Sequence, residues 1–499
     1  MTGGYDVIVA GGGSAGCAAA ARLSEDPRRR VLLLEAGPDP VPVPPLVEDA
    51  TKVPELWETP FVLRYPTPRQ EGGTFDSLAG RIMGGGSAVN WMTVTWPIAE
   101  DFAEWARRGN PDWSWDHVLP ALRRIEADQD YPDDPLHGKD GPLYVKRSYR
   151  FDRPLGGQQQ AFIDGAVAMG LPVCPDQNVP SPYGVSATAT NIRDGRRQST
   201  AVAYLGPARS RPNLAIVADA TVTSLRLAGL RAEGVTYLRG GQSHTALADE
   251  VVLCAGVYHS PQILMLSGIG PARELERVGI PVVCGLDGVG ENYQDHAVVF
   301  MRFASVGNRR EGWAGPSVIL SAKSDPSRPF LDFYALMYRA LTGGGGQVIL
   351  PITVRYLEQR SRGRVFLESA DPSRLPRVDA RMLQHPDDVK AIVAAMEFVR
   401  DLARTAPMRA FYGPLVEPAE GTDWARHARR HFDSFHHGVG TCMMGPASDP
   451  GAVVDQRLRV HGVSNLRVAD ASIMPTIVHA ATHLTCIMIG ERAADFLKA

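Results

Sequence analysis

The first hydrophobic segments of the chain are separated by a glycine-rich turn and a stretch of small residues. Residues 5–10 (YDVIVA) have the pattern of a buried strand, and the small residues at 18–23 have that of a closely packed helix. A second apolar strand follows at 30–34 and leads into Glu35. The order strand, helix, strand predicts a βαβ unit, with which a parallel sheet begins.

Strand patterns return in the middle of the chain and then change character. We expect strands at 214–218, 221–227, 234–239 and 250–254, the last of which ends in a turn of small residues. Aromatic residues alternate along 316–356, and this favours an antiparallel sheet over further βαβ units. A helix is expected at 387–404, and the segment from Leu466 onward regains the character of the first domain.

These patterns predict an α/β fold with two domains. A Rossmann-like nucleotide-binding domain, discontinuous in sequence, is expected to take 1–150, 196–297 and 440–499. An α+β substrate-binding domain, built on an antiparallel sheet, is expected to take 151–195 and 298–439. Residues 38–78 are rich in proline and polar turns, so we expect a loop excursion there. Ser260-Pro261 predicts the start of a further helix, which Ser267-Gly268 would end.

Composition and charge are those of an ordinary globular enzyme. The chain has 499 residues with a net charge of −3, so no nucleic acid or anionic membrane is expected as a partner. No apolar stretch is as long as a membrane span, and because the first strand pattern begins at residue 5 we expect neither a membrane span nor a signal peptide. The six cysteines show no CxxC pair. They are expected to be free thiols in a reducing compartment, the cytoplasm.

The glycine run after the first strand has the spacing of a dinucleotide-binding fingerprint. Gly11 permits the tight turn, Gly13 lets the backbone approach a pyrophosphate, and Gly16 allows close packing of helix and strand. The following helix offers its N-terminal N–H groups to the phosphates. Glu35 is placed to accept hydrogen bonds from ribose hydroxyls, which disfavours a 2′-phosphate. The fingerprint alone leaves NAD and FAD open.

Five further motifs follow the fingerprint. With it, they resemble the glucose–methanol–choline (GMC) oxidoreductases, a family of FAD enzymes, nearly end to end from Tyr5 to Leu497. In sequence order they are GRIMGGGSAVN (80–90), SPQILMLSGIGP (260–271), VGENYQDH (289–296), HGVGT (437–441) and LRVADASIMP (466–475). The resemblance implies FAD rather than NAD, and Val89 stands where some relatives carry a histidine that attaches the flavin, so FAD is expected to be non-covalent.

The resemblance also implies two active-site histidines, His437 and His483. Oxidation of an alcohol requires removal of the hydroxyl proton while a hydride leaves the carbon for flavin N5. A histidine, with a pKa of about 6.5, can accept that proton near neutrality. His437 is therefore expected to be the general base, and His483 is expected to hydrogen-bond the substrate oxygen.

Other site residues are carried over from the family motifs. Asp470 and Ala471 match the segment that contacts the pyrophosphate and ribityl chain, Val222 matches a position where backbone groups hold adenine, and the last helix is expected to begin at 482–485, with its N-terminus near the flavin. The expected cofactor-binding residues are Gly11, Gly13, Ser14, Ala15, Gly16, Glu35, Arg81, Gly85, Ser87, Asn90, Val222, Asp470, Ala471, Leu484 and Thr485.

The substrate pocket is predicted only by location. His436 and Phe435 precede the expected base, and Tyr334 and Tyr338 lie on the expected antiparallel sheet, as do Met337 and Gln347. A metal site formed by His436, His437, His479 and His483 is an alternative, favoured by the i, i+4 spacing of the last two. No carboxylate or HExxH motif accompanies these histidines, so we expect no metal.

The sequence therefore predicts an FAD-dependent alcohol oxidase or dehydrogenase that converts CH–OH to an aldehyde or ketone. Its partners would be a small-molecule alcohol and an electron acceptor, either O2 or another carrier. Phe435 lies near a position that is often small in oxidases, and its bulk disfavours fast reaction with O2. A hydroxynitrile-lyase-like enzyme on the same flavin fold remains an alternative, as does a flavin-bearing binding protein. The substrate and the oligomeric state are not specified by the sequence.

Overall fold

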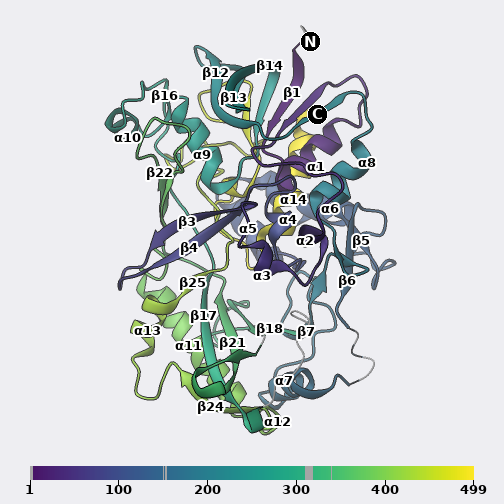
Figure 1. Cartoon of the computed structure of the whole chain (residues 1–499), viewed down its shortest axis with the longest axis vertical. Coiled ribbons are helices and arrows are strands. Elements are labelled where there is room, and N and C mark those ends of the chain that lie inside the picture. Colours follow the sequence, from purple (N-terminus) through teal and green to yellow (C-terminus); the bar gives the residue numbers. More distant parts are fainter. Residues whose placement is uncertain (1–3, 150, 152–153, 309–317, 339, 499) are drawn as a thin grey trace.

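The computed structural model describes residues 4–149, 151, 154–308, 318–338 and 340–498. Two large sheets organise these residues. The first sheet and the helices against it form one half of the molecule, and the second sheet with α11 (Pro386–Ala403) forms the other half (Figure 1). Both chain termini lie in the first half.

The first sheet has seven strands, of which five run parallel. Its parallel strands are apolar where they lie in the core: Val9, Leu33 and Leu253 are fully buried. The strand order is β11 (Leu214–Val217), β2 (Val31–Leu34), β1 (Tyr5–Ala10), β14 (Gln242–Leu253), β13 (Arg231–Arg239) and β12 (Thr221–Ala228), with β26 (Leu466–Val468) also paired to β14.

The second sheet has eight strands, all paired antiparallel. It confirms the antiparallel sheet expected from the aromatic alternation. Its strands are β24 (Tyr412–Glu417), β17 (Ala297–Ser305), β21 (Val348–Tyr356), β19 (Phe333–Met337), β18 (Val318–Ala322) and β7 (Gly184–Ala187), with β20 (Leu341–Thr342) paired to β21 and β25 (Asp433–Ser434) to β17.

Helices near the two ends of the chain pack together beside the first sheet. Helix α1 (Ser14–Leu23) follows β1 directly, and α14 (Thr482–Lys498) lies against it. Gly490 makes this possible, since a Cβ there would lie 2.2 Å from the carbonyl oxygen of Ala15. The other helices are α2 (Pro45–Glu48), α3 (Val53–Leu56), α4 (Gly86–Val89), α5 (Ala99–Arg107), α6 (Trp115–Ile125), α7 (Gly157–Ala168), α8 (Gly206–Ala208), α9 (Gly256–Leu266), α10 (Ala272–Arg277), α12 (Ala406–Arg409) and α13 (Trp424–His431).

Smaller sheets of two or three strands complete the described fold. They pair β3 (Val62–Pro68) with β4 (Thr74–Gly80), β5 (Glu126–Asp128) with β6 (Leu143–Arg147), β6 with β8 (Ala189–Thr190), β9 (Ile192–Arg193) with β10 (Arg196–Arg197), β15 (Ile269–Gly270) with β16 (Cys284–Gly285), and β22 (Arg364–Phe366) with β23 (Arg377–Asp379). The domain limits expected from the sequence stay a prediction.

Residues 38–78 are more regular than a loop. They contain α2, α3 and most of the two-stranded hairpin β3–β4 (Figure 1). In β3, buried and exposed positions alternate, with Tyr65 buried and the prolines 66 and 68 exposed. Proline is tolerated in such a strand because β3 pairs on one side only, with β4. The proline content of 38–78 therefore suggested a loop, although the alternation of buried and exposed positions at 62–68 is that of a strand.

Helix α9 begins four residues before the expected start and contains Pro261 in its interior. Proline has no N–H to donate to the carbonyl four residues earlier, which belongs to Val257. The hydroxyl of Thr441 donates to that carbonyl instead, at 2.6 Å. This hydrogen bond satisfies the carbonyl and allows α9 to run through the proline. The predicted end at Ser267 is confirmed.

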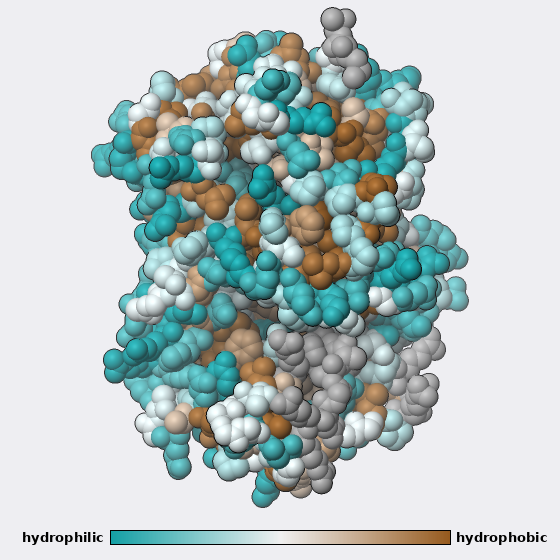
Figure 2. Space-filling model, viewed as in Figure 1, coloured by the Kyte–Doolittle hydropathy of each residue, from teal (hydrophilic) through white to brown (hydrophobic). Residues whose placement is uncertain are grey.

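In the described ranges no helix is both long and apolar enough to cross a bilayer. On the face in Figure 2, hydrophobic residues lie in separate groups among hydrophilic ones. All six cysteines are free thiols. The expected cytoplasmic location stays a prediction.

Candidate active site

A cavity of about 670 Å³ extends from the glycine-rich turn after β1 to the second sheet. This volume is in the range of cofactor and ligand sites. Both expected active-site histidines line it, although 46 positions of sequence separate them. Its wall includes most of the expected cofactor residues: Gly11, Gly13, Ser14, Ala15, Glu35, Arg81, Gly85, Asn90, Val222, Asp470 and Ala471.

Four expected cofactor residues lie behind this wall. Ser87 is buried and fixes the second glycine-rich segment, because its hydroxyl donates to the Gly84 carbonyl at 2.6 Å and bonds the hydroxyl of Thr200 at 2.9 Å. Leu484 and Thr485 are buried inside α14, and the Thr485 hydroxyl has no partner. The fourth residue, Gly16, serves packing.

The glycine positions of the fingerprint fit a bound dinucleotide. Gly11 has a φ of +116°, and a Cβ there would lie 2.3 Å from the backbone oxygen of Cys254. A Cβ on Gly16 would lie 1.9 Å from the oxygen of Gly11. At Gly13, by contrast, a Cβ would meet nothing within 4 Å, because this backbone faces the cavity. The turn is therefore closed on its protein side and open where a pyrophosphate would approach.

Glu35 directly follows β2, and its carboxylate is buried at the cavity wall. Its two oxygens accept hydrogen bonds from the backbone N–H groups of Gly12, at 2.7 Å, and Gly37, at 2.8 Å. Burial raises the pKa of Glu35 to about 7, although these hydrogen bonds favour the charged form. Each oxygen keeps a further lone pair, so the carboxylate can also accept from a ribose hydroxyl.

Asp470 joins two of the sequence motifs. Its Oδ2 accepts from the Gly256 N–H, at 2.8 Å, and from the Ser260 hydroxyl, at 2.5 Å. Its Oδ1 accepts from the N–H and the hydroxyl of Ser472, at 2.8 and 2.6 Å. The carboxylate therefore holds the first turn of α9 against the LRVADASIMP segment, and both segments line the cavity.

His437 lies on the segment that follows β25, at the end of the cavity that the second sheet helps to form. Its Nδ1 is 2.9 Å from Nδ1 of His296, so one of these nitrogens carries the shared proton. Burial lowers the pKa of His437 well below its ordinary value, and the neighbouring His296 and Arg355 act in the same direction. The ring is therefore neutral at physiological pH, and Nε2 is its remaining nitrogen.

Asp295 fixes the backbone on which His437 stands. Its Oδ1 accepts from the backbone N–H groups of His437, at 2.9 Å, and His296, at 2.7 Å, and its Oδ2 accepts from the Ser434 hydroxyl at 2.5 Å. Burial raises the pKa of Asp295 to about 6, and these donors oppose the increase. The sequence alone indicated no role for Asp295 or His296, although both end the VGENYQDH motif.

His483 lies in the first turn of α14 and contacts the other end of the site. Its Nδ1 is 3.4 Å from the hydroxyl of Ser14 in the fingerprint, and its Nε2 is buried without a partner. Burial and the charge of Arg197 lower the pKa of His483 to about 4. The structure therefore places both histidines on one cavity, with His437 against His296 and His483 against the fingerprint.

Aromatic side chains lie around His437. The Phe435 ring lies 4.2 Å from the His437 ring, and His436 meets Trp57 edge-on at 5.1 Å. Tyr338 also lines the cavity, as predicted. Burial and the charge of Arg64 lower the pKa of His436 to about 4, so this ring is neutral as well.

Tyr334 is a correction to the predicted pocket. Its hydroxyl donates to the His479 carbonyl at 2.8 Å, away from the cavity. Side chains alternate along a strand, and Met337 of β19 faces the cavity, so Tyr334 must face the other side. Gln347 is exposed and lies outside the cavity wall.

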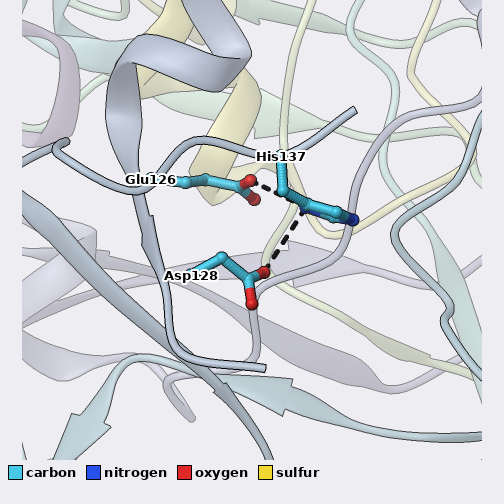
Figure 3. A group of neighbouring side chains, drawn as sticks. All are labelled: Glu126, Asp128 and His137. Atoms are coloured by element: carbon cyan, nitrogen blue, oxygen red, sulfur yellow. Dashed lines mark hydrogen bonds and ion pairs between the residues drawn. The ribbon is translucent and has the colours of Figure 1, made fainter. Parts of the chain in front are cut away.

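The i, i+4 spacing of His479 and His483, which favoured a metal site, does not place them on one helix face. His479 precedes α14, so it shares no helix face with His483, and its Nδ1 is 2.6 Å from Oδ1 of Asp101. A different group comes together: Glu126, Asp128 and His137, with His137 Nδ1 3.0 Å from Glu126 and 3.4 Å from Asp128 (Figure 3).

This buried group is an ion-pair network. The other nitrogen of His137 is 2.8 Å from Asp176, and Arg147 pairs with both Asp128 and Asp176. Burial opposes a charge on His137, but its hydrogen bonds to Asp176 and Glu126 raise its pKa to about 9. His137 is therefore protonated on both ring nitrogens, which donate to carboxylates. The network has two positive charges, one on His137 and one on Arg147.

Comparisons with known proteins agree with this arrangement. Models of the GMC oxidoreductase family match residues 5–298 and 359–490. The chain belongs to the GMC oxidoreductases. It is 34% identical to human mitochondrial choline dehydrogenase, over 99% of this chain and 90% of that protein. It is also 34% identical to 5-(hydroxymethyl)furfural oxidase of Methylovorus sp., over 98% of both.

Among solved structures, pyridoxine 4-oxidase from Mesorbium loti superposes with a TM-score of 0.91 at 29% identity, over 98% of both chains. These similarities confirm the predicted family, the two-part α/β fold and FAD as the cofactor. The chain is an oxidoreductase that acts on alcohol-type substrates.

Proposed function

We propose that this enzyme oxidises a primary or secondary alcohol to an aldehyde or ketone, with His437 as the general base. The observation that supports this most strongly is the single cavity that joins the fingerprint at Gly13 to His437. FAD, when bound, supplies the hydride acceptor N5. Gly13, the N-terminus of α1 and Glu35 are placed to hold its ADP part.

His437 is suited to take the proton of the substrate hydroxyl. We assign the proton of the Nδ1–Nδ1 hydrogen bond to His437, which donates it to His296. The Nε2 atom of His437 then carries a free lone pair, and this is the atom that accepts the substrate proton. The low pKa keeps Nε2 unprotonated before substrate binds. Asp295 keeps the ring in place through the His437 backbone N–H.

His483 could act on the substrate side or on the cofactor side of the cavity. The sequence places it beside the substrate oxygen as a hydrogen-bond partner. Its contact with Ser14 favours a role in holding the fingerprint around the cofactor. We therefore propose the cofactor side as its main role.

The remaining FAD contacts follow from the cavity wall. Arg81, Gly85 and Asn90 line it from the second glycine-rich segment, and Val222 lines it on β12. Val89 also lines it, and its aliphatic side chain offers no nucleophile for a bond to the flavin, in keeping with non-covalent FAD.

Anaerobic mixing of the FAD-loaded enzyme with a panel of alcohols tests the proposal. We expect at least one primary alcohol to bleach the flavin absorbance and to yield the matching carbonyl product. A panel in which every alcohol leaves the oxidised spectrum unchanged, while a carbonyl compound and cyanide are released from a cyanohydrin, would instead establish the lyase alternative. Oxygen consumption by the reduced enzyme then distinguishes O2 from another acceptor.

A further inference from the structure

The end of the cavity that carries His437 also contains an arginine, Arg355, for which the described part of the chain provides no ion-pair partner. Arg355 lies on β21, between β17 and β19 in the second sheet. On this strand Thr353 and Arg355 line the cavity, whereas the alternate residues Ile352 and Val354 belong to the hydrophobic core. One face of β21 is therefore apolar and packs in the core, and the charged side chain of Arg355 lies on the opposite face, toward the cavity.

The guanidinium group of Arg355 has an aromatic neighbour but no carboxylate. Its central carbon lies 3.8 Å from the centroid of the Phe435 ring, a cation–π contact. Its Nε is buried and has no hydrogen-bond partner. Within the described residues, no aspartate or glutamate lies within ion-pair distance of Arg355. Burial lowers the pKa of Arg355 to about 9, so the group still carries its charge at neutral pH.

Other buried or half-buried arginines of the described chain have acceptors within it: Arg197 donates to the carbonyl oxygens of Val47, at 3.0 Å, and Asn90, at 2.6 Å. Arg147 pairs with Asp128 and Asp176, and Arg22 donates to Glu491 at 2.8 Å. The two carboxylates near the His437 end of the cavity are occupied elsewhere. Asp295 accepts the hydrogen bonds that hold His437, and Asp433 accepts from the backbone of Ser434 at 2.9 Å. Since a desolvated charge is costly without a partner, the missing anion is expected to come from a ligand.

We infer that Arg355 binds a carboxylate on the substrate, so that the preferred alcohols are flat ring compounds carrying both a CH–OH group and an acidic group. This inference rests on the proposed function. With its central carbon over the Phe435 ring, the planar guanidinium can present its N–H groups to a carboxylate, which it pairs with through two hydrogen bonds. The aromatic lining residues Trp91, Phe300 and Tyr338 suit a ring between the two functional groups.

Two matched substrates test the inference on the FAD-loaded enzyme. Flavin reduction is measured anaerobically with 4-(hydroxymethyl)benzoate and with its methyl ester, which has the same ring and alcohol but no charge. We expect the carboxylate to give a reduction rate per concentration about 10-fold or more above the ester. In Arg355→Met this ratio should fall at least 10-fold, and Arg355→Lys should restore part of it because it keeps the charge.

A second measurement does not depend on turnover. Titration calorimetry with benzoate and benzamide compares an anion with a neutral molecule of the same shape, and we expect only benzoate binding to depend on Arg355. Arg430→Met, on the exposed surface of α13, controls for the loss of one positive charge from the protein. FAD content and melting temperature show whether each variant is folded.

The outcomes separate the two proposals. Reduction by both substrates with no preference for the carboxylate, or an equal loss with both substrates in Arg355→Met, overturns the inference and leaves alcohol oxidation in place. Arg355-dependent binding of benzoate without flavin bleaching by any alcohol supports the anion site and contradicts the proposed function.

Discussion

At the cofactor end of the cavity, positions are set mainly by the backbone, and at the reacting end they are set by side chains. The fingerprint turn is defined by where a Cβ is forbidden, at Gly11 and Gly16, and by where it is free, at Gly13. Around His437 the arrangement depends on its hydrogen bonds to Asp295 and His296. The first end can therefore bind a cofactor common to many enzymes, whereas the second end determines what reacts there.

The largest effect that separates the two ends is expected from His437→Ala. Removing the base should slow flavin reduction by about 10²–10⁴-fold, while FAD content stays near that of the wild type, because His437 lies at the far end of the cavity from the fingerprint. Stopped-flow reduction under anaerobic conditions and the flavin-to-protein absorbance ratio measure the two quantities. Reduction at a rate close to wild type would show that His437 is not the base.

Gly11→Ala should have the opposite signature. A positive φ costs a residue with a Cβ about 1–2 kcal/mol, and the clash with the Cys254 oxygen adds to this, so we expect FAD affinity to fall about 10-fold or more. Gly229→Ala is the matched control, since it has a φ of +61° but no neighbour within 4 Å of a Cβ. An equal loss of FAD in both variants would mean that general destabilisation, and not the turn, is responsible.

His483→Ala tells which end of the cavity this residue serves. Because the Nδ1 of His483 contacts the Ser14 hydroxyl, we expect FAD retention to weaken by about 10-fold and the reduction rate of the loaded enzyme to change less. Dialysis against FAD-free buffer followed by single-turnover reduction measures both. A loss of reduction with full FAD retention would establish the substrate-side role predicted from the sequence.

The smallest effect on chemistry is expected from the Glu126–Asp128–His137 network, which faces neither end. His137→Gln should leave flavin reduction unchanged and lower the melting temperature by a few degrees, because buried carboxylates lose their partner. The folded pKa of about 9 lies above the ordinary value of about 6.5. The stabilisation is therefore complete below pH 6.5 and is lost as pH rises through 9. Melting curves should show a gap between the two proteins that narrows over this range; a constant gap would contradict a charged His137.

The cofactor end could be predicted from the sequence because its requirements are local. Gly11, Gly16 and the strand that leads into Glu35 lie within one βαβ unit, and each follows from a backbone constraint. Tyr334 shows the limit at the other end. Its aromatic character suggested a pocket residue, but which face of β19 meets the cavity depends on the register of the sheet, and no local signal sets that register.

Asp295, His296 and Arg355 were missed for a related reason. Their roles depend on residues far away in the chain, His437 and Phe435, which the fold brings beside them. The signal for Asp295 and His296 was present, since two polar residues end a motif that runs into the buried strand β17. The sequence also contained a signal for Arg355, because it is a charged residue within an apolar strand pattern.

Thr441 donates a hydrogen bond to the Val257 carbonyl, which Pro261 leaves without its helical donor. Substitutions at these two distant positions are therefore expected to depend on each other. Pro261→Ala would let α9 recover its own hydrogen bond, and the second lone pair of the Val257 carbonyl could still accept from the Thr441 hydroxyl. Thr441→Val would leave the Val257 carbonyl buried without a donor unless the proline were replaced as well. Thr441→Val should therefore be less harmful in the Pro261→Ala background than alone, and related chains that lack this proline should be freer to lose the hydroxyl.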